Sequence, residues 1–255
     1  DLTVAGTGGS VSAGGTYPSG TQVTVTATAN AGYTFSGFTG GGCGASSPCV
    51  FNLTADTTVT ANFTANPYYI NSYADPAPGG NVTPGPGFQT FGATVAYTQT
   101  TNAGYVFTGW SGLCSGTGAC NVVVPVGGGS VVANYTAIPN YTLTTVAGTG
   151  GTVSAGGTYQ SGTQVTVTAT ANAGYTFSGF TGGPCGGTNP CVFNLTANTT
   201  VTANFTPNNY YLNTYADPAP GGTVTPGAGF HPYGSTVDRK STRLNSSHVA
   251  LSRMP

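Results

Sequence analysis

The first 237 residues of this 255-residue chain contain no lysine, arginine or glutamate, and four aspartates are their only charged side chains. Charged residues make up 4% of the whole chain, against roughly 25% in an average soluble protein. A surface without cations cannot neutralise a row of phosphates, so nucleic acid is excluded as a partner. No apolar run approaches the length of a membrane span. Because 38% of the residues are hydrophobic, a folded core is still expected.

All four basic residues follow Val237, in the segment DRKSTRLNSSHVALSRMP. This abrupt change in composition indicates two origins within one chain. Residues 238–255 resemble the translation of a sequencing adapter, and we predict that they are a non-native tail that takes no part in the fold. The alternative is a natural basic tail.

The rest of the chain is an internal repeat. Val4 recurs as Val146 and Cys43 as Cys185, both 142 positions later, and half of that spacing is also present. The predicted organisation is therefore A-B-A-B with units of about 71 residues. We place repeat A1 at 1–65, B1 at 66–137, A2 at 138–207 and a truncated B2 at 208–237. Short joints containing Pro or Asn predict semi-stiff tandem packing.

Apolar residues alternate with polar ones, which is the pattern of strands. In QVTVTATA, Val23 and Val25 point to one face while Thr24 and Thr26 point to the other. No stretch shows a sustained helical period. We predict an all-β fold of small tandem β-sheet modules, either β-grasp-like or small sandwiches.

An aromatic strand of the form GYxFxG(F/W) occurs three times, at 32–38, 104–110 and 174–180. We expect its rings to fill the core of a unit too small to bury much else. Gly37 would allow a bulge that redirects Phe38. The alternative is a platform on which a carbohydrate stacks, with Trp110, the only tryptophan, as its best candidate; this alternative requires Trp110 to be exposed.

Six cysteines form three pairs with the same spacing. Local pairing is predicted because the spacing recurs, and each disulfide would close a Gly-rich loop and imply export from the cell. The alternative, a zinc site, is disfavoured because residues 1–237 hold a single His. The predicted disulfides are Cys43–Cys49, Cys114–Cys120 and Cys185–Cys191.

The cysteine loop is also where the two A repeats differ most. Between Val4 and Thr64 they differ at seven positions, four of which lie in or beside this loop. An exposed loop is a natural place for ligand contact, although such loops also drift freely. Besides Trp110, the candidate contact residues are Ala45, Ser46, Ser47, Thr188 and Asn189.

Taken together, GG(S/T)VS, GTQVTVTA, AGYTFSGF, the cysteine loop and TTVTANFT resemble the divergent relatives of the internalin B-repeat of bacterial surface and secreted proteins. The resemblance covers 1–237. It implies small β-sheet modules resembling a β-grasp, used in tandem as a stalk or adhesive surface, with no catalytic residue to transfer.

Catalysis is not expected, because the ionisable groups differ between copies: Asp56 becomes Asn198, and His231 stands where B1 has Gln89. We expect a non-catalytic, extracellular or surface-displayed structural and adhesive array, monomeric, without metal or cofactor, and binding an extracellular protein or glycan. The alternative is a set of accessory binding modules of a secreted hydrolase whose catalytic domain lies outside this sequence.

Overall fold

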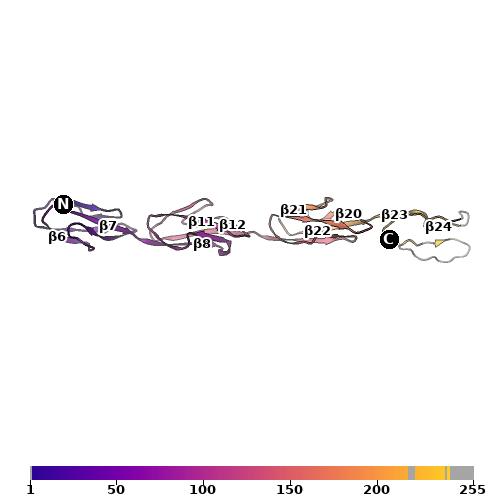
Figure 1. Cartoon of the computed structure of the whole chain (residues 1–255), viewed down its shortest axis with the longest axis horizontal. Coiled ribbons are helices and arrows are strands. Elements are labelled where there is room, and N and C mark those ends of the chain that lie inside the picture. Colours follow the sequence, from indigo (N-terminus) through magenta and orange to yellow (C-terminus); the bar gives the residue numbers. More distant parts are fainter. Residues whose placement is uncertain (1, 218–221, 239, 242–255) are drawn as a thin grey trace. The chain divides into compact units, whose positions relative to one another are not determined.

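The computed structural model describes residues 2–217, 222–238 and 240–241, so most of the predicted non-native tail, 238–255, lies outside the described residues. The chain divides into two compact units, residues 1–137 and 138–255. Unit 1 contains A1 and B1, and unit 2 contains A2 and the start of B2 (Figure 1). Nearly all regular structure is β, and one turn of 3-10 helix, η1 (Ala77–Gly79), is the only helix among the described residues. No helix of this part of the chain has the length and apolarity needed to cross a membrane.

B1 is a small two-layer sandwich. Its strands are β8 (Pro67–Asp75), β9 (Gly80–Thr83), β10 (Gly87–Thr90), β11 (Thr94–Thr101), β12 (Tyr105–Gly112), β13 (Cys120–Val123) and β14 (Gly129–Ala137). One sheet has the order β10-β8-β14-β12 and the other β13-β11-β9. Buried side chains from both sheets, among them Ile70, Tyr97 and Val122, form one core. Of the two architectures expected, B1 is therefore the sandwich.

A1 and A2 repeat this plan with two differences. In A1 the larger sheet has three strands instead of four, because residues 15–18 form no strand there. The long strand β11 of B1 is divided in A1 into β3 (Thr21–Val25) and β4 (Ala27–Ala29), which pair with different neighbours. The other strands of A1 are β1 (Leu2–Ala5), β2 (Gly9–Val11), β5 (Tyr33–Thr39), β6 (Cys49–Leu53) and β7 (Thr58–Ala65). Val23 and Val25 are buried while Thr24 and Thr26 are exposed, which confirms the predicted alternation.

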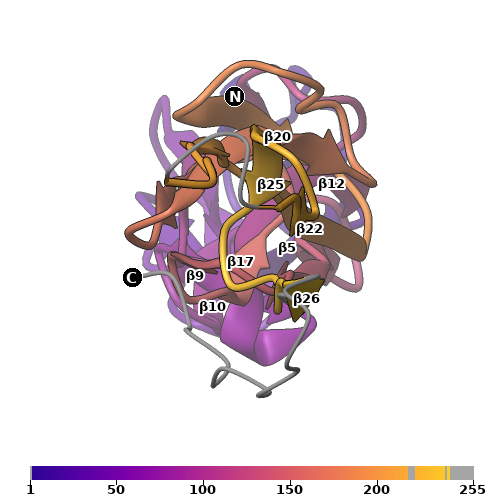
Figure 2. The ribbon, with the colours of Figure 1, turned by 90° about the vertical axis from the view of Figure 1, so that its right-hand side faces the viewer.

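Unit 2 begins with the strands of A2, seen close to end-on in Figure 2. They are β15 (Asn140–Ala147), β16 (Gly151–Val153), β17 (Gly157–Gln160), β18 (Thr163–Val167), β19 (Ala169–Ala171), β20 (Tyr175–Thr181), β21 (Cys191–Leu195) and β22 (Thr199–Pro207). β23 (Asn209–Leu212), β24 (Val224–Thr225), β25 (Gly229–Pro232) and β26 (Lys240–Ser241) follow. Because β23 pairs with β25 as β8 pairs with β10, B2 starts in the same way as B1.

The aromatic strand contains a β-bulge in every complete module. In β5 the register with β7 shifts between Phe35 and Gly37, and φ of Gly37 is +132°. Residues three apart point to opposite faces of a regular strand, but one inserted residue returns Phe38 to the face of Phe35. The two rings then pack 4.7 Å apart, and Phe38 is buried. This confirms the predicted role of Gly37.

An asparagine from the closing strand supports each bulge. In B1, the Asn134 amide donates to the carbonyl of Gly109 (2.9 Å) and to the hydroxyl of Ser111 (3.0 Å). Asn62 in A1 and Asn204 in A2 make the corresponding bonds to Gly37 and Gly179. A bulge leaves a backbone group without a ladder partner, and the asparagine supplies one. The aromatic motif and the ANF or ANY motif therefore depend on each other.

The first and last strands of every complete module are adjacent and parallel. β1 pairs with β7, β8 with β14, and β15 with β22, each in parallel register. Two parallel neighbours begin at the same edge of the sheet and end at the opposite edge. The chain therefore enters a module at one end and leaves it at the other.

Candidate functional site: the disulfide loops and the joint within each A–B pair

All six cysteines are paired as predicted, in Cys43–Cys49, Cys114–Cys120 and Cys185–Cys191, with Cα–Cα distances of 5.6, 5.6 and 5.4 Å. The second cysteine of each pair starts a strand and is buried, at 2% exposure for Cys120. The described residues contain no group of three His, Cys, Asp or Glu side chains placed to hold a metal.

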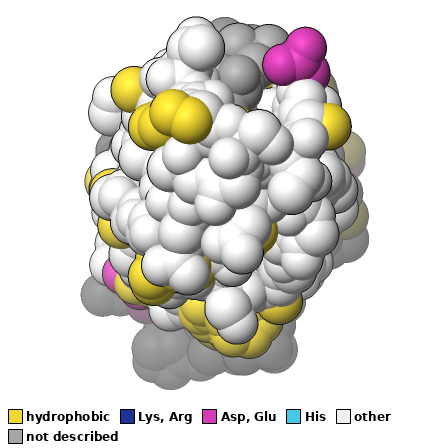
Figure 3. All heavy atoms as spheres, turned by 90° about the vertical axis from the view of Figure 1, so that its left-hand side faces the viewer, with side chains coloured by type: hydrophobic (Ala, Val, Ile, Leu, Met, Phe, Trp, Pro, Cys, Tyr) yellow, Lys and Arg dark blue, Asp and Glu magenta, His cyan; other side chains and the backbone are white. Residues whose placement is uncertain are grey.

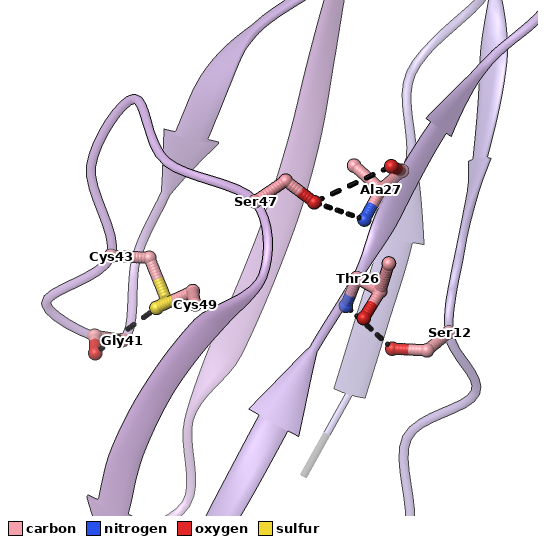
Figure 4. Close-up of a disulfide and its surroundings, with 7 residues drawn as sticks. All are labelled: Ser12, Thr26, Ala27, Gly41, Cys43, Ser47 and Cys49. Atoms are coloured by element: carbon pink, nitrogen blue, oxygen red, sulfur yellow. Dashed lines mark hydrogen bonds between the residues drawn. A yellow bond between two sulfur atoms is a disulfide. The ribbon is translucent and has the colours of Figure 1, made fainter.

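The loop closed by the disulfide is exposed in both A modules, as expected for Ala45, Ser46 and Thr188. Two of the candidate contact residues hold the loop in place instead of pointing freely into solvent. The Ser47 hydroxyl accepts from the amide of Ala27 (2.9 Å) and donates to its carbonyl (3.4 Å), as Figure 4 shows. Asn189 bonds both groups of Ala169 in the same way (3.0 and 2.8 Å).

These bonds satisfy the backbone where the long strand of the A modules is divided. Thr26 follows β3, and its amide donates to the hydroxyl of Ser12 (3.0 Å), on the other side of the strand from Ser47 (Figure 4). Ser154 does the same for Thr168 in A2. Ser12 and Ser47 therefore supply hydrogen bonds to the backbone between β3 and β4. This role was not visible in the sequence pattern.

Trp110 lies in the core of B1, as predicted for the rings of the aromatic strand, and the alternative of a carbohydrate platform, which required an exposed ring, is wrong. Its side chain is only 7% exposed. The indole packs at 5.4 Å from Phe107, and its Nε1 donates to the carbonyl of Gly118 (3.0 Å) inside the cysteine loop. The physical reason is the bulge before it, which turns the ring inward. Trp110 ties the disulfide loop of B1 to the core.

A second feature joins A1 to B1, and the sequence pattern did not reveal it. One residue, Asn66, separates β7 from β8. Its amide donates to the carbonyl of Gly32 (2.8 Å), and its side-chain oxygen accepts from the hydroxyl of Thr34 (2.6 Å). The amide of Phe91 in turn donates to the carbonyl of Asn66 (2.9 Å). Asn66 thus bonds both modules at once.

Aromatic packing completes this joint. The ring of Phe91 from B1 lies edge-on to Tyr33 of A1 (5.5 Å between ring centroids) and to Tyr68 of B1 (6.2 Å). It covers Gly32, where φ is +86° and any Cβ would run into the Phe91 ring. Glycine in this turn between β4 and β5 is therefore required twice, for its conformation and for the close approach of the ring.

The same joint occurs in unit 2. Asn208 bonds Gly174 (2.7 Å) and Thr176 (2.6 Å), and Tyr233 lies edge-on to Tyr175 at 5.7 Å. Between B1 and A2 the sequence is different. Ser161 takes the place of Phe91, and its amide donates to the carbonyl of Pro139. Pro139 stands at the position that is Asn66 in the A1–B1 joint. The residues that form the joint therefore occur where an A module is followed by a B module, and the sequence between B1 and A2 lacks them.

Ionisable groups in the described residues are few. They include Asp56, Asp75, Asp217 and His231, which lie in different modules or on different elements. Burial raises the pKa of Tyr97 and of Tyr135. The Tyr135 hydroxyl bonds Gln99 and the carbonyl of Thr100 (both 3.0 Å), while the Tyr97 hydroxyl is buried without a hydrogen-bond partner. Both rings belong to the core of B1.

Comparison with known proteins gives one family. The model of the divergent InlB B-repeat domain matches three segments in tandem, residues 1–67, 73–139 and 141–209. A search of the curated proteins gives no match. The segments cover A1, B1 and A2, the three modules that carry a disulfide, a bulge and a parallel pair of terminal strands.

Proposed function

Since the chain belongs to the divergent InlB B-repeat family, we propose that it is part of a non-catalytic, extracellular repeat array that acts as a stalk and presents a repeated adhesive surface. The observation that carries this proposal is the joint built from Asn66 and Phe91. This joint holds the two modules of an A–B pair in one arrangement. A spacer depends on such stiffness between neighbouring modules.

Two further features support the spacer role. Parallel terminal strands pass the chain from one end of a module to the other, so that A1 leads directly into B1 at the joint. A pull on the two ends also loads the hydrogen bonds between β8 and β14 together, because the strands would have to slide past each other. Three disulfides support an oxidising, extracellular location.

Residual dipolar couplings of the full chain would test the joint. We expect A1 and B1 to share one alignment tensor. Phe91→Ser, which installs the residue that A2 has at this position, should give them separate tensors. Phe88→Ser is the matched control, because Phe88 lies in β10, three residues before Phe91, but is 70% exposed and lies outside the A1–B1 joint. Independent orientations of A1 and B1 in the unchanged chain would refute the spacer proposal.

A further inference from the structure

The B modules carry exposed aromatic rings at three positions where A2 carries Thr142, Thr158 and Val146. On the outer face of B1, Phe88 of β10 lies directly opposite Tyr69 of β8. Their rings pack edge-on at 5.3 Å, yet they remain 70% and 48% exposed. Tyr73, 44% exposed, lies on the same face of β8 about 13 Å further along the strand. We call these three rings the aromatic platform of B1.

The start of B2 repeats the platform. Tyr211 lies opposite Phe230, with the ring centroids 5.1 Å apart and 58% and 71% exposed. Tyr215 stands at the place of Tyr73 and is 76% exposed. The platform is therefore a property of the B type and recurs every 142 residues.

The fold does not require these rings. In A2 the equivalent positions of β15 and β17 hold Thr142 and Thr158, whose hydroxyls lie 3.5 Å apart. The same sheet forms around either pair. Large rings that a fold can replace with threonine, and that stay exposed in both copies, indicate a binding surface.

The surroundings of the platform indicate the class of ligand. Asn71 lies between Tyr69 and Tyr73 on the outer face of β8, and Thr90 lies two residues after Phe88; both are exposed hydrogen-bonding groups. No lysine or arginine occurs before residue 239, so the module offers neither side chain to pair with an anionic ligand. In Figure 3, which views the chain from the end where A1 lies, the charged side chains in colour are carboxylates.

From these observations we propose that the aromatic platforms of B1 and B2 bind a neutral polysaccharide. Sugar rings offer apolar C–H faces that stack on tyrosine and phenylalanine, and hydroxyls that bond asparagine and threonine. One platform is small, and two on one chain would raise the apparent affinity through effective concentration. This inference deepens the adhesive part of the proposed function and names its ligand class.

Affinity electrophoresis of the full chain through gels containing hydroxyethylcellulose, laminarin, soluble starch or galactomannan would test it, with alginate as the anionic comparison. We expect retardation by at least one neutral polymer and none by alginate. The variant Tyr69→Thr/Phe88→Thr/Tyr211→Thr/Phe230→Thr, which installs the A-type residues, should lose at least about tenfold in affinity, since stacking carries the binding. Changing one platform alone should give an intermediate loss.

The matched control is Val50→Thr/Val192→Thr, which removes two apolar side chains that are each 51% exposed on the A modules. It should bind like the unchanged chain. Trp110 fluorescence verifies that B1 is folded in every variant. The inference fails if no neutral polymer retards the chain, or if the fourfold variant is retarded equally. Sedimentation that shows a dimer abolished by the fourfold variant would assign the platform to self-association and overturn it as well. The alignment-tensor test of the joint is independent of all these outcomes.

Discussion

Removing the disulfide of B1 tests how far a small sandwich depends on its cross-link. A module of about 70 residues is expected to have a free energy of unfolding of only about 4–10 kcal/mol. Closing the short loop between Cys114 and Cys120 stabilises it by about 2 kcal/mol through the entropy of the unfolded chain. The second cysteine is 2% exposed, so Cys114→Ala/Cys120→Ala also loses packing. We expect a total loss of about 2–4 kcal/mol.

The chain provides a selective probe for this measurement. Trp110 is the only tryptophan, and its indole donates to Gly118 inside the loop that the disulfide closes. Urea unfolding followed by tryptophan fluorescence therefore reports B1 alone, even in the full chain. The expected result is a lower midpoint for the B1 variant, with a slope close to that of the unchanged chain.

The matched control is Cys185→Ala/Cys191→Ala, which removes the equivalent disulfide from A2 in the other unit. It should leave the fluorescence transition in place. The reasoning is refuted if the B1 variant loses less than about 0.5 kcal/mol, a change typical of a neutral surface substitution, or if the A2 variant shifts the tryptophan signal by the same amount.

Three further outcomes follow from single side chains. Asn134→Ala should cost B1 about 1 kcal/mol in the same assay because it leaves the bulge carbonyl unpaired; an unchanged midpoint would contradict this role. Ser47→Ala should destabilise A1 by about 1 kcal/mol and Ser46→Ala should not, measured by amide hydrogen exchange. Equal effects of the two substitutions would contradict a stabilising role of the Ser47 hydrogen bonds. Tyr97→Phe should leave B1 as stable or up to about 1 kcal/mol more stable, since the hydroxyl has no partner. Burial raises the pKa of Tyr97 above its usual 10.0, so the unfolded chain releases this proton first and stability should fall as the pH rises above 10. The fall should be smaller in Tyr97→Phe, and an identical alkaline profile would argue against burial as its cause.

Local features of the fold were readable from the sequence because each depends on residues close together in the chain. The alternation in QVTVTATA predicted β3, the spacing of Phe35, Gly37 and Phe38 predicted the bulge, and the recurring cysteine spacing predicted three disulfides. The sequence left two architectures open, β-grasp-like modules or small sandwiches, and in B1 the two sheets pack as a sandwich. Alternation shows that a strand has one buried face but does not show what covers that face.

The joint could not be predicted because its parts come from distant positions. Tyr33 lies in the aromatic strand of A1, Asn66 in the linker and Phe91 directly after β10 of B1. A signal was present: the position is aromatic in both B repeats, as Phe91 and Tyr233, and serine in A2, as Ser161. Two interpretations stood open for Trp110. Its rarity made it the best candidate for a carbohydrate platform, while its place in the aromatic motif predicted correctly that it lies in the core.

The joint also bears on how such an array can lengthen. Its aromatic ring comes only from the module that follows an A, so a gene duplication that copies a whole A–B pair reproduces every contact of the joint without a new mutation. Copying an A alone would place serine against the glycine-containing turn before the aromatic strand of its predecessor. The smallest heritable step that preserves the joint is therefore the 142-residue pair, which is the period at which the sequence repeats.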